Sequence, residues 1–182
     1  YVAALSDILD SLDRRGQVMS WRLRPLLPDM KNCGFVGRAR TVRWTDIDHI
    51  DYDDPYGLEI DMVDSLQPND VVVHATDWGR TNAPWGELMS TRAMQLGAAG
   101  AVLDGYSRDT KGIFRLGFPT FSCGSYAQDQ RVRGRVIDYG CPLEFGNGVV
   151  VEPGDIVFGD IDGVVIIPRR DEPAIIDAAL YK

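Results

Sequence analysis

The segment that decides the fold is VVVHATDWGRTNAPWGELMSTRAMQLGAAGAVLDGYSRD, residues 71–109. It opens with a short apolar run, Val71–His74, and a second apolar run follows at Ala101–Asp104. We predict that both runs are buried strands and that residues 85–96 between them form a helix. A strand, a helix and a second strand in this order are typical of a βαβ unit.

Both flanks of this unit carry secondary-structure signals of their own. Hydrophobic residues recur at helical spacing before Gly16, which predicts a first amphipathic helix ended by glycine. Alternation over Phe35–Trp44 predicts a strand, and Thr110–Leu116 is predicted to be a short helix. After residue 133, Gly and Pro turns separate apolar runs, which indicates hairpins. We therefore expect one α/β domain over residues 1–182, with a βαβ unit that carries the site and a β-rich C-terminal half.

Length and composition are those of an ordinary globular protein. The 182 residues suffice for one buried core, and the chain is 45% hydrophobic and 25% charged. No apolar run approaches the roughly 20 residues that a membrane span needs, so we expect no membrane partner. The formal net charge of -8 repels phosphate backbones, so we expect no nucleic-acid partner either.

The cysteines and the two ends of the chain bear on the cellular compartment and on whether residues are missing. Cys33, Cys123 and Cys141 lie far apart without metal-ligand spacing, so we expect reduced core thiols. The start of the sequence shows no secretory or transit segment, so we expect a cytoplasmic protein. The chain begins at Tyr1 and stops at Lys182 after an apolar stretch of helical type, so we expect residues to be missing at both ends.

The sequence lacks the motifs or residues that several common catalytic mechanisms require. No GxGxxG follows a predicted strand, and neither GxxxxGK[ST] nor GxSxG occurs, which argues against dinucleotide, P-loop and α/β-hydrolase sites. With only His49 and His74, one chain cannot build a three-histidine zinc centre, and His74 in a valine strand is expected in the core. A Schiff base would rest on Lys111 by elimination. The acidic run at the start of Asp46–Asp64, formed by Asp46, Asp48, His49, Asp51, Asp53 and Asp54, lacks the Gly and terminal Glu of a calcium loop, so we interpret it as solvated. Carboxylate-bound metal remains the most available chemistry.

An Arg-Asp pair and a helix N-terminus are predicted to meet at one end of the sheet. Gly86 opens the predicted helix, so the backbone amides of Leu88 and Met89 can bind an anion. Arg108 and Asp109 follow the next strand, at the edge where open α/β sheets place ligands. Such a site would offer an anion hole, a guanidinium for a carboxylate and a carboxylate for a hard cation. The alternative is a capped helix beside a solvated ion pair.

The same residues resemble a family signature that spans most of the chain. The chain is similar to the RraA-like family, which includes 4-hydroxy-4-methyl-2-oxoglutarate/4-carboxy-4-hydroxy-2-oxoadipate aldolases, in the motifs Leu5–Asp10, Gly86–Met89, Gly97–Asp109, Gly117–Pro119, Pro153–Asp155 and Asp160–Val165. The resemblance implies a swivelling β/β/α fold. It also implies a homotrimer or a dimer of trimers with sites near subunit boundaries.

The resemblance assigns roles to the residues of the predicted site. Asp109 would hold Mg2+ or Mn2+, with water at most remaining positions. Arg108 would bind the 2-oxoacid substrate and the developing enolate. The amides of Leu88 and Met89, reached past Gly86, would cradle the pyruvyl group.

Glu87 is the expected base. The resemblance gives it the role of orienting or deprotonating a metal-associated water, although the family commonly has Asp at this position. Several aldolases of the family also have an acid where this chain has Gly112, which leaves the substrate open.

The predicted activity is that of a class II, divalent-metal-dependent lyase. It would cleave 4-hydroxy-2-oxoacids with release of pyruvate, or decarboxylate oxaloacetate, because both reactions pass through the enolate of pyruvate. The alternative is a non-catalytic, protein-binding regulator like the regulator of ribonuclease E that gives the family its name. That regulator lacks the metal-binding Asp of the aldolases, whereas this chain has Asp109.

Overall fold

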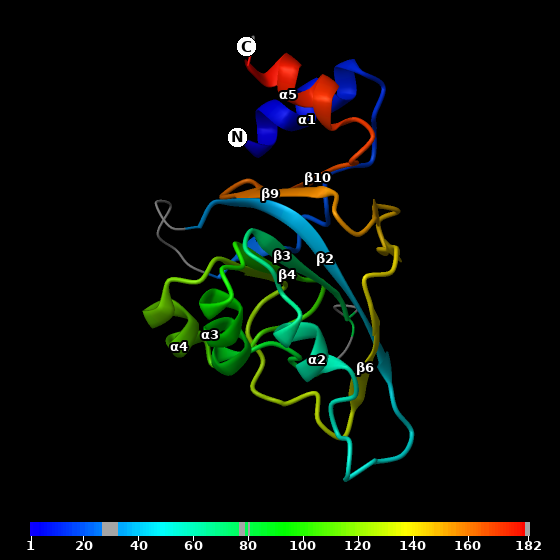
Figure 1. The fold of residues 1–182 in the computed structure, drawn as a ribbon, viewed down its shortest axis with the longest axis vertical. Coiled ribbons are helices and arrows are strands. Elements are labelled where there is room, and N and C mark those ends of the chain that lie inside the picture. Colours follow the sequence, from blue (N-terminus) through cyan, green and yellow to red (C-terminus); the bar gives the residue numbers. More distant parts are fainter. Residues whose placement is uncertain (27–32, 77–78, 80, 181–182) are drawn as a thin grey trace.

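A large mixed sheet is the frame of the structure. The computed structural model describes residues 1–26, 33–76, 79 and 81–180. Its eight-stranded sheet (Figure 1) contains β1 (Arg24–Pro25), β2 (Phe35–Asp46), β3 (Asp70–Ala75), β4 (Gly100–Leu103), β5 (Thr120–Ser122), β6 (Gly134–Tyr139), β9 (Ile156–Asp160) and β10 (Gly163–Ile167). The strand order is β1-β5-β4-β3-β2-β9-β10, and β6 pairs with β2 beside this path. Neighbours from β2 to β5 are parallel, and the other pairings are antiparallel.

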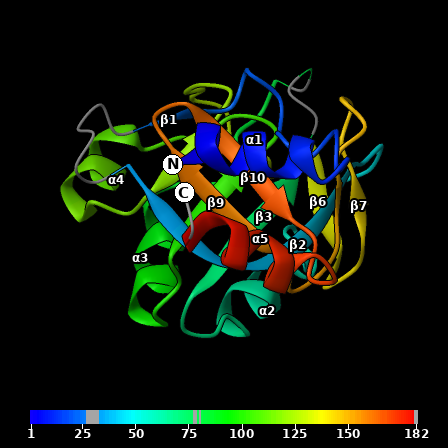
Figure 2. The same ribbon diagram turned by 90° about the horizontal axis from the view of Figure 1, so that it is seen from above.

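Helices cover one side of the central strands and one end of the sheet. Their bounds are α1 (Val2–Ser11), α2 (Glu59–Asp64), α3 (Glu87–Gln95), α4 (Thr110–Leu116) and α5 (Glu172–Leu180). α2, α3 and α4 lie together on one side of the sheet (Figure 1). α1 and α5 lie side by side over β9 and β10 (Figure 2). A small hairpin, β7 (Leu143–Glu144) with β8 (Val150–Val151), forms a separate two-stranded sheet.

The predicted βαβ unit is confirmed as β3, α3 and β4. The two strands pair in parallel, with Val71 opposite Gly100. α3 begins at Glu87, so the predicted helix start at residue 85 is wrong. Trp85 cannot join the helix because its backbone is held in an extended bridge to Ser107.

The C-terminal half is β-rich, as predicted, but hairpins form only part of it. The pairs β7–β8 and β9–β10 are antiparallel hairpins. The expectation of a hairpin is wrong for β6, which pairs with β2 instead. β2 is long enough for two partners on the same edge: Phe35–Arg38 lies beside β9 and Val42–Asp46 beside β6.

Alternating side chains of the central strands fill two hydrophobic layers. Val71 and Val73 of β3 belong to a core shared with the C-terminal hairpins. Val72 packs in a second core with residues of α2, α3 and α4. Burial on both faces explains why β3 is a continuous valine run rather than an alternating one. A third cluster joins α1 and α5 to β10.

The cysteine side chains and the helix lengths bear on two further expectations. Cys33 is buried and Cys123 and Cys141 are partly buried, and all three are reduced thiols, as predicted. Across the described ranges, no helix has both the length and the apolar character that crossing a membrane requires.

Candidate functional site

Three segments are held side by side where β3 and β4 end. Backbone bridges pair Trp85 with Ser107 and Ala83 with Asp129. The amide of Arg108 donates to the carbonyl oxygen of Trp85 at 2.8 Å. The loop before α3 and the loop after β4 therefore meet as predicted, and a third segment around Asp129 joins them.

Trp85 fixes the position of the α3 N-terminus. Its side chain is fully buried, and its indole Nε1 donates to Ser90 Oγ at 2.8 Å. Its ring stacks on Phe118, with the ring centroids 6.4 Å apart. Because Ser90 lies near the start of α3, this contact sets where the helix begins relative to Arg108.

Gly86 lets Asp109 approach the start of α3. A Cβ at residue 86 would lie 2.5 Å from Asp109 Oδ2 and 3.2 Å from Arg108 Cγ, so a larger residue would displace one or both side chains. The backbone of Gly86 is extended, with φ -155°, so close approach rather than backbone freedom requires glycine here. Asp109 has φ 54° at the N-cap of α4, a left-handed conformation that is uncommon for residues other than Gly, Asn and Asp. Residues other than Gly that are held in this conformation cluster at binding and active sites.

Arg108 is held between two carboxylates. Its Nε lies 3.5 Å from Asp109 Oδ2, and its Nη1 lies 3.3 Å from Asp129 Oδ2. The side chain of Arg108 is 33% exposed, so a ligand can reach it. Guanidinium carries five N–H donors, and these two contacts leave donors for a substrate carboxylate.

Glu87 lies against α4. Its Oε1 is 3.3 Å from Arg115 Nη2, and a Cβ added at Gly112 would collide with its Cδ. The two departures from the family pattern are thus linked in space, since the longer acid at residue 87 fills room that a side chain at residue 112 would need. In this arrangement the Glu87 carboxylate is turned toward α4.

A cavity of about 450 Å³ collects most of the predicted residues and some that were not predicted. Its wall includes Gly86, Leu88, Met89, Arg108 and Asp109 from the prediction, together with Glu59 and Asp129. Glu87 is not part of this wall. Sequence reasoning missed Glu59, although its spacing from Met62 and Val63 on α2 already places it on the buried face of a helix.

Glu59 is connected to the core by two hydrogen bonds in series. Trp44 Nε1 donates to Gln130 Oε1 at 2.6 Å, and Gln130 Nε2 donates to Glu59 Oε2. Burial, followed by the negative charge of Asp129, raises the pKa of Glu59 to about 8. The carboxyl is therefore mainly protonated at neutral pH.

A larger cavity of about 520 Å³ lies elsewhere. It is bounded by the N-terminal loop, the ends of β2 and β4 and the β7–β8 turn, with Arg22, Asp46, Asp104 and Glu144 in its wall. None of the residues predicted to carry the chemistry lines it. We therefore place the candidate site in the smaller cavity, which holds Arg108 and Asp109.

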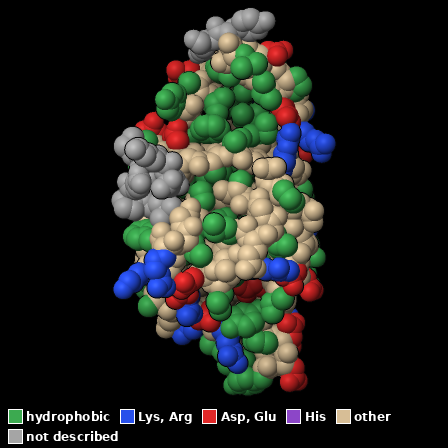
Figure 3. All heavy atoms as spheres, turned by 60° about the vertical axis from the view of Figure 1, so that its left-hand side comes forward, with side chains coloured by type: hydrophobic (Ala, Val, Ile, Leu, Met, Phe, Trp, Pro, Cys, Tyr) green, Lys and Arg blue, Asp and Glu red, His purple; other side chains and the backbone are tan. Residues whose placement is uncertain are grey.

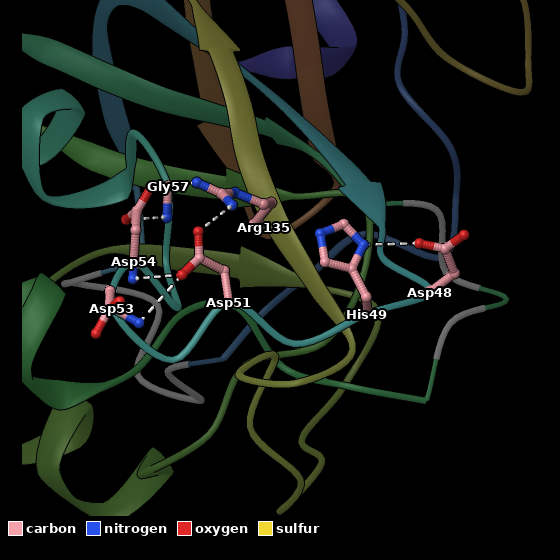
Figure 4. A network of polar contacts seen from close by, with 7 residues as sticks. All are labelled: Asp48, His49, Asp51, Asp53, Asp54, Gly57 and Arg135. Atoms are coloured by element: carbon pink, nitrogen blue, oxygen red, sulfur yellow. Dashed lines mark hydrogen bonds and ion pairs between the residues drawn. The ribbon is translucent and has the colours of Figure 1, made fainter.

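The acidic run over residues 46–54 is mostly exposed, as predicted (Figure 4), whereas the end of the acidic stretch forms α2 with Glu59 buried. Asp51 Oδ1 accepts the backbone amides of Asp53 and Asp54, both at 3.1 Å. Arg135 of β6 pairs with Asp54, and His49 is exposed beside a neighbouring carboxylate. These carboxylates stabilise turns and an ion pair. Among the residues that the structure describes, no cluster of three or more His, Cys, Asp or Glu side chains could hold a metal.

The remaining predicted candidates lie away from the cavity. His74 is a buried core residue, as expected, with Nδ1 2.7 Å from Thr76 Oγ1. Burial lowers its pKa to about 3, so its ring is neutral. Lys111 is exposed on α4.

The donor chemistry at Asp109 fits a hard divalent cation. Mg2+ keeps several waters and is commonly bound through one or two carboxylates, so a three-ligand protein cluster is not required. The Asp109 side chain is 42% exposed at the cavity wall, which leaves room for water around its oxygens. Asp109 with water is the set that would hold such an ion.

Comparisons with known proteins identify the family of the chain. The family model RraA-like (Aldolase/RraA) matches residues 2–166. The chain belongs to the RraA-like family. The swivelling fold expected from the resemblance is confirmed by the crystal structure of RraAS2 from Streptomyces coelicolor, described as an unusual member of the RNase ES inhibitor RraA family. That structure has a TM-score of 0.83 and 26% identity, and the match covers 98% of this chain and 85% of that one.

Two relatives of this RraA-like chain differ in length. A protein of Halalkalibacterium halodurans named "Putative 4-hydroxy-4-methyl-2-oxoglutarate aldolase" is 31% identical over 98% of this chain and 77% of its own. Protein DlpA of Legionella pneumophila is 29% identical over 92% of this chain, which corresponds to only 26% of DlpA. The chain thus spans about a quarter of the length of DlpA.

Proposed function

We propose that this RraA-like chain is a divalent-metal-dependent carbon-carbon lyase. It would cleave 4-hydroxy-2-oxoacids with release of pyruvate, decarboxylate oxaloacetate, or catalyse both reactions. The observation that supports this is the contact of Arg108 and Asp109 with Gly86 at the N-terminus of α3, in the wall of a cavity of substrate size.

Substrate binding would use a guanidinium and a helix terminus together. The first amides of an α-helix have no partner within the helix, so those of Leu88 and Met89 can donate to an anion. Arg108 lies beside them and is kept in place by Asp129. A 2-oxoacid places a carboxylate and a carbonyl oxygen side by side, and these two donor groups match them.

Charge stabilisation is the main demand of both reactions. Mg2+ or Mn2+ held by Asp109 would supply Lewis-acid polarisation of the 2-oxo group. Arg108 would add a preorganised positive charge, and one such donor is typically worth about 3 kcal/mol in the transition state. Aldol cleavage also needs a base for the 4-hydroxyl proton, and we assign that role to Glu87. For this its carboxylate has to turn from Arg115 toward the cavity.

The family resemblance also suggests a trimer or a dimer of trimers. Figure 3 shows acidic, basic and hydrophobic side chains close together on the lower half of the face that carries α3 and α4. At the cavity, Leu88 is 85% exposed and Ile60 is 63% exposed. Large exposed apolar side chains beside a site are the kind that a second subunit covers. Light scattering on the purified protein would give the assembly state.

A non-catalytic regulator that binds another protein is the second candidate. The similarity to RraAS2 supports it, because that protein is described as a member of an inhibitor family. The two candidates differ in what Asp109 does. An enzyme requires its carboxylate, whereas a protein-binding surface would tolerate an amide of the same size at one exposed position.

Pyruvate release tests the proposal. Purified protein is given oxaloacetate or a panel of 4-hydroxy-2-oxoacids with Mg2+ or Mn2+, and pyruvate is measured with lactate dehydrogenase. Because free metal decarboxylates oxaloacetate unaided, Asp109→Asn at the same metal concentration is the matched control. We expect turnover above the background rate with the wild type and not with Asp109→Asn. Chelator should abolish this turnover, and added metal should restore it. Equal rates for both proteins on every substrate would favour the regulator. Full activity in excess chelator, or substrate trapped on Lys111 by borohydride, would rule out the metal mechanism.

A further inference from the structure

Glu59 is a buried carboxyl group in the cavity wall that the proposed mechanism does not yet use. It lies on α2, is 7% exposed, and lines the same cavity as Arg108 and Asp109. Burying a carboxyl group costs free energy unless it is neutral or well paired. No cation pairs with it in the part of the chain that the structure describes, so its position calls for an explanation.

The hydrogen bonds to Glu59 determine which of its oxygens carries the proton. Indole Nε1 is only a donor, so the oxygen of the Gln130 amide must face Trp44. The NH2 group of Gln130 must then face Glu59, and it donates to Oε2. Glu59 Oε2 is thus an acceptor, and the acidic proton belongs on Oε1. Oε1 has no hydrogen-bond partner among the described residues.

The charges around the cavity favour the neutral form of Glu59. Asp129 is next to Gln130 in the chain, and its charge acts together with burial to raise the pKa of Glu59 to about 8. The arginines in the cavity wall are already paired: Arg108 with Asp129 and Asp109, and Arg92 with the exposed Asp64 at 2.8 Å. Tyr56 is the other titratable group in this wall.

We propose that Glu59 is the acid that protonates C3 of the pyruvate enolate, an inference that rests on the proposed lyase function. Cleavage of the carbon-carbon bond leaves its electron pair in the enolate. The enolate π electrons then form a C3–H bond with the proton on Glu59 Oε1. The O–H electron pair stays on Glu59 as carboxylate, which recovers a proton from water. The same residue in reverse removes a C3 proton from pyruvate.

Methyl-proton exchange of pyruvate in D2O isolates this step, because it needs no carbon-carbon cleavage. Proton NMR with Mg2+, which is diamagnetic, follows the loss of the methyl signal. Glu59→Gln keeps the acceptor for Gln130 but cannot carry the proton, so we expect exchange to fall by about 10²-fold or more, the usual worth of a general acid or base. Asp61→Asn, an exposed carboxyl on the same helix, is the matched control and should exchange like the wild type.

The pH dependence gives a measurement that does not rely on a variant folding. Exchange begins with the ionised carboxylate, so the wild-type rate should rise with pH and level off above about pH 8. Glu59→Asp, which keeps an acid on a shorter side chain, should recover part of the exchange that Glu59→Gln loses.

The outcomes separate this inference from the proposed function. Wild-type exchange that Glu59→Gln retains within about twofold, or that does not change between pH 6 and 9, would overturn the role of Glu59 while pyruvate release still supports the lyase. Absence of both exchange and pyruvate release in the wild type would overturn the lyase, and the role of Glu59 with it.

Discussion

The side chain of Glu87 occupies the space above Gly112. A Cβ at residue 112 would collide with Glu87 Cδ, and Arg115 one turn further along α4 holds the Glu87 carboxylate at 3.3 Å. The acid on α3 and the glycine on α4 therefore have to be considered together. A side chain at residue 112 and a long acid at residue 87 exclude one another in this arrangement.

This contact predicts a coupled effect on stability. Gly112 is inside a helix, where Ala is preferred over Gly by about 1 kcal/mol. We expect Gly112→Ala to lack that gain, or to destabilise, because its Cβ displaces Glu87. In a Glu87→Ala background the same substitution should stabilise by about 1 kcal/mol. Urea unfolding of the four proteins measures the cycle, and an additive result would mean that the two side chains do not compete.

Asp109→Asn should abolish metal binding and both lyase reactions together. The substitution removes the only charged ligand proposed for the cation while keeping the size of the side chain. Isothermal titration with Mn2+ and the pyruvate assay are the two measurements. Lost activity with unchanged Mn2+ affinity would contradict the metal role and point to Asp109 as a partner of Arg108 instead.

Arg108→Lys should lower kcat/KM for every substrate while metal binding stays normal. Lysine keeps the charge but lacks the planar fork that pairs with a carboxylate and with Asp129 at once. A loss of about 10- to 100-fold corresponds to roughly 1.4 to 2.8 kcal/mol of transition-state stabilisation. Arg24→Lys, at a residue that does not line the cavity, is a control that should leave kinetics unchanged. Equal kinetics for Arg108→Lys and the wild type would remove Arg108 from the site.

The sequence predicted that Gly86 and Asp109 lie together, but it did not predict the helix start after Trp85 or the presence of Asp129. Apolar runs and a glycine were enough to place Gly86 beside Asp109, because parallel strands of a βαβ unit bring their following loops to one edge of the sheet. The Trp85 bridge that shortens α3 could not be read from periodicity, since it depends on pairing with Ser107. Asp129 reaches the cavity from a loop twenty residues further along the chain than Asp109, and no local pattern marks it.

The orientation of Glu87 is a further limit of sequence reasoning. Spacing places the residue in the first turn of α3, and its predicted role is to orient or deprotonate a water on the metal that Asp109 would hold. Which way the side chain turns depends on the empty space above Gly112 and on Arg115, both on another helix. The role of Glu87 as base therefore stays a prediction that kinetics must decide.

Glu87→Gln should separate the two lyase reactions. The amide cannot accept a proton, so aldol cleavage, which needs the 4-hydroxyl proton removed, should fall by about 10²- to 10⁴-fold. Oxaloacetate decarboxylation needs no such base and should survive far better. Arg115→Gln is a useful companion, because it removes the partner that holds Glu87 on α4 without touching the cavity wall. An equal loss of both reactions in Glu87→Gln, with fold and metal affinity intact, would make Glu87 a positioning residue.

His74 should make the protein less stable as the pH falls. Burial lowers the pKa of His74 to about 3 in the folded state, against about 6.5 for an exposed histidine. Between these values the unfolded chain binds a proton that the folded chain excludes, so stability is fully present above about pH 6.5 and is lost as pH falls toward 3.

His74→Gln cannot titrate, and its amide can still bond to Thr76 Oγ1. The stability difference between wild type and His74→Gln should therefore shrink by up to about 1.4 kcal/mol for each pH unit below about 6. Urea unfolding of both proteins at pH 7, 6, 5 and 4 measures this difference. The pH-dependent contributions of the carboxylates cancel in it, because both proteins have the same carboxylates. A constant difference over that range would show that His74 is protonated in the folded protein, and that the core around β3 accommodates its charge.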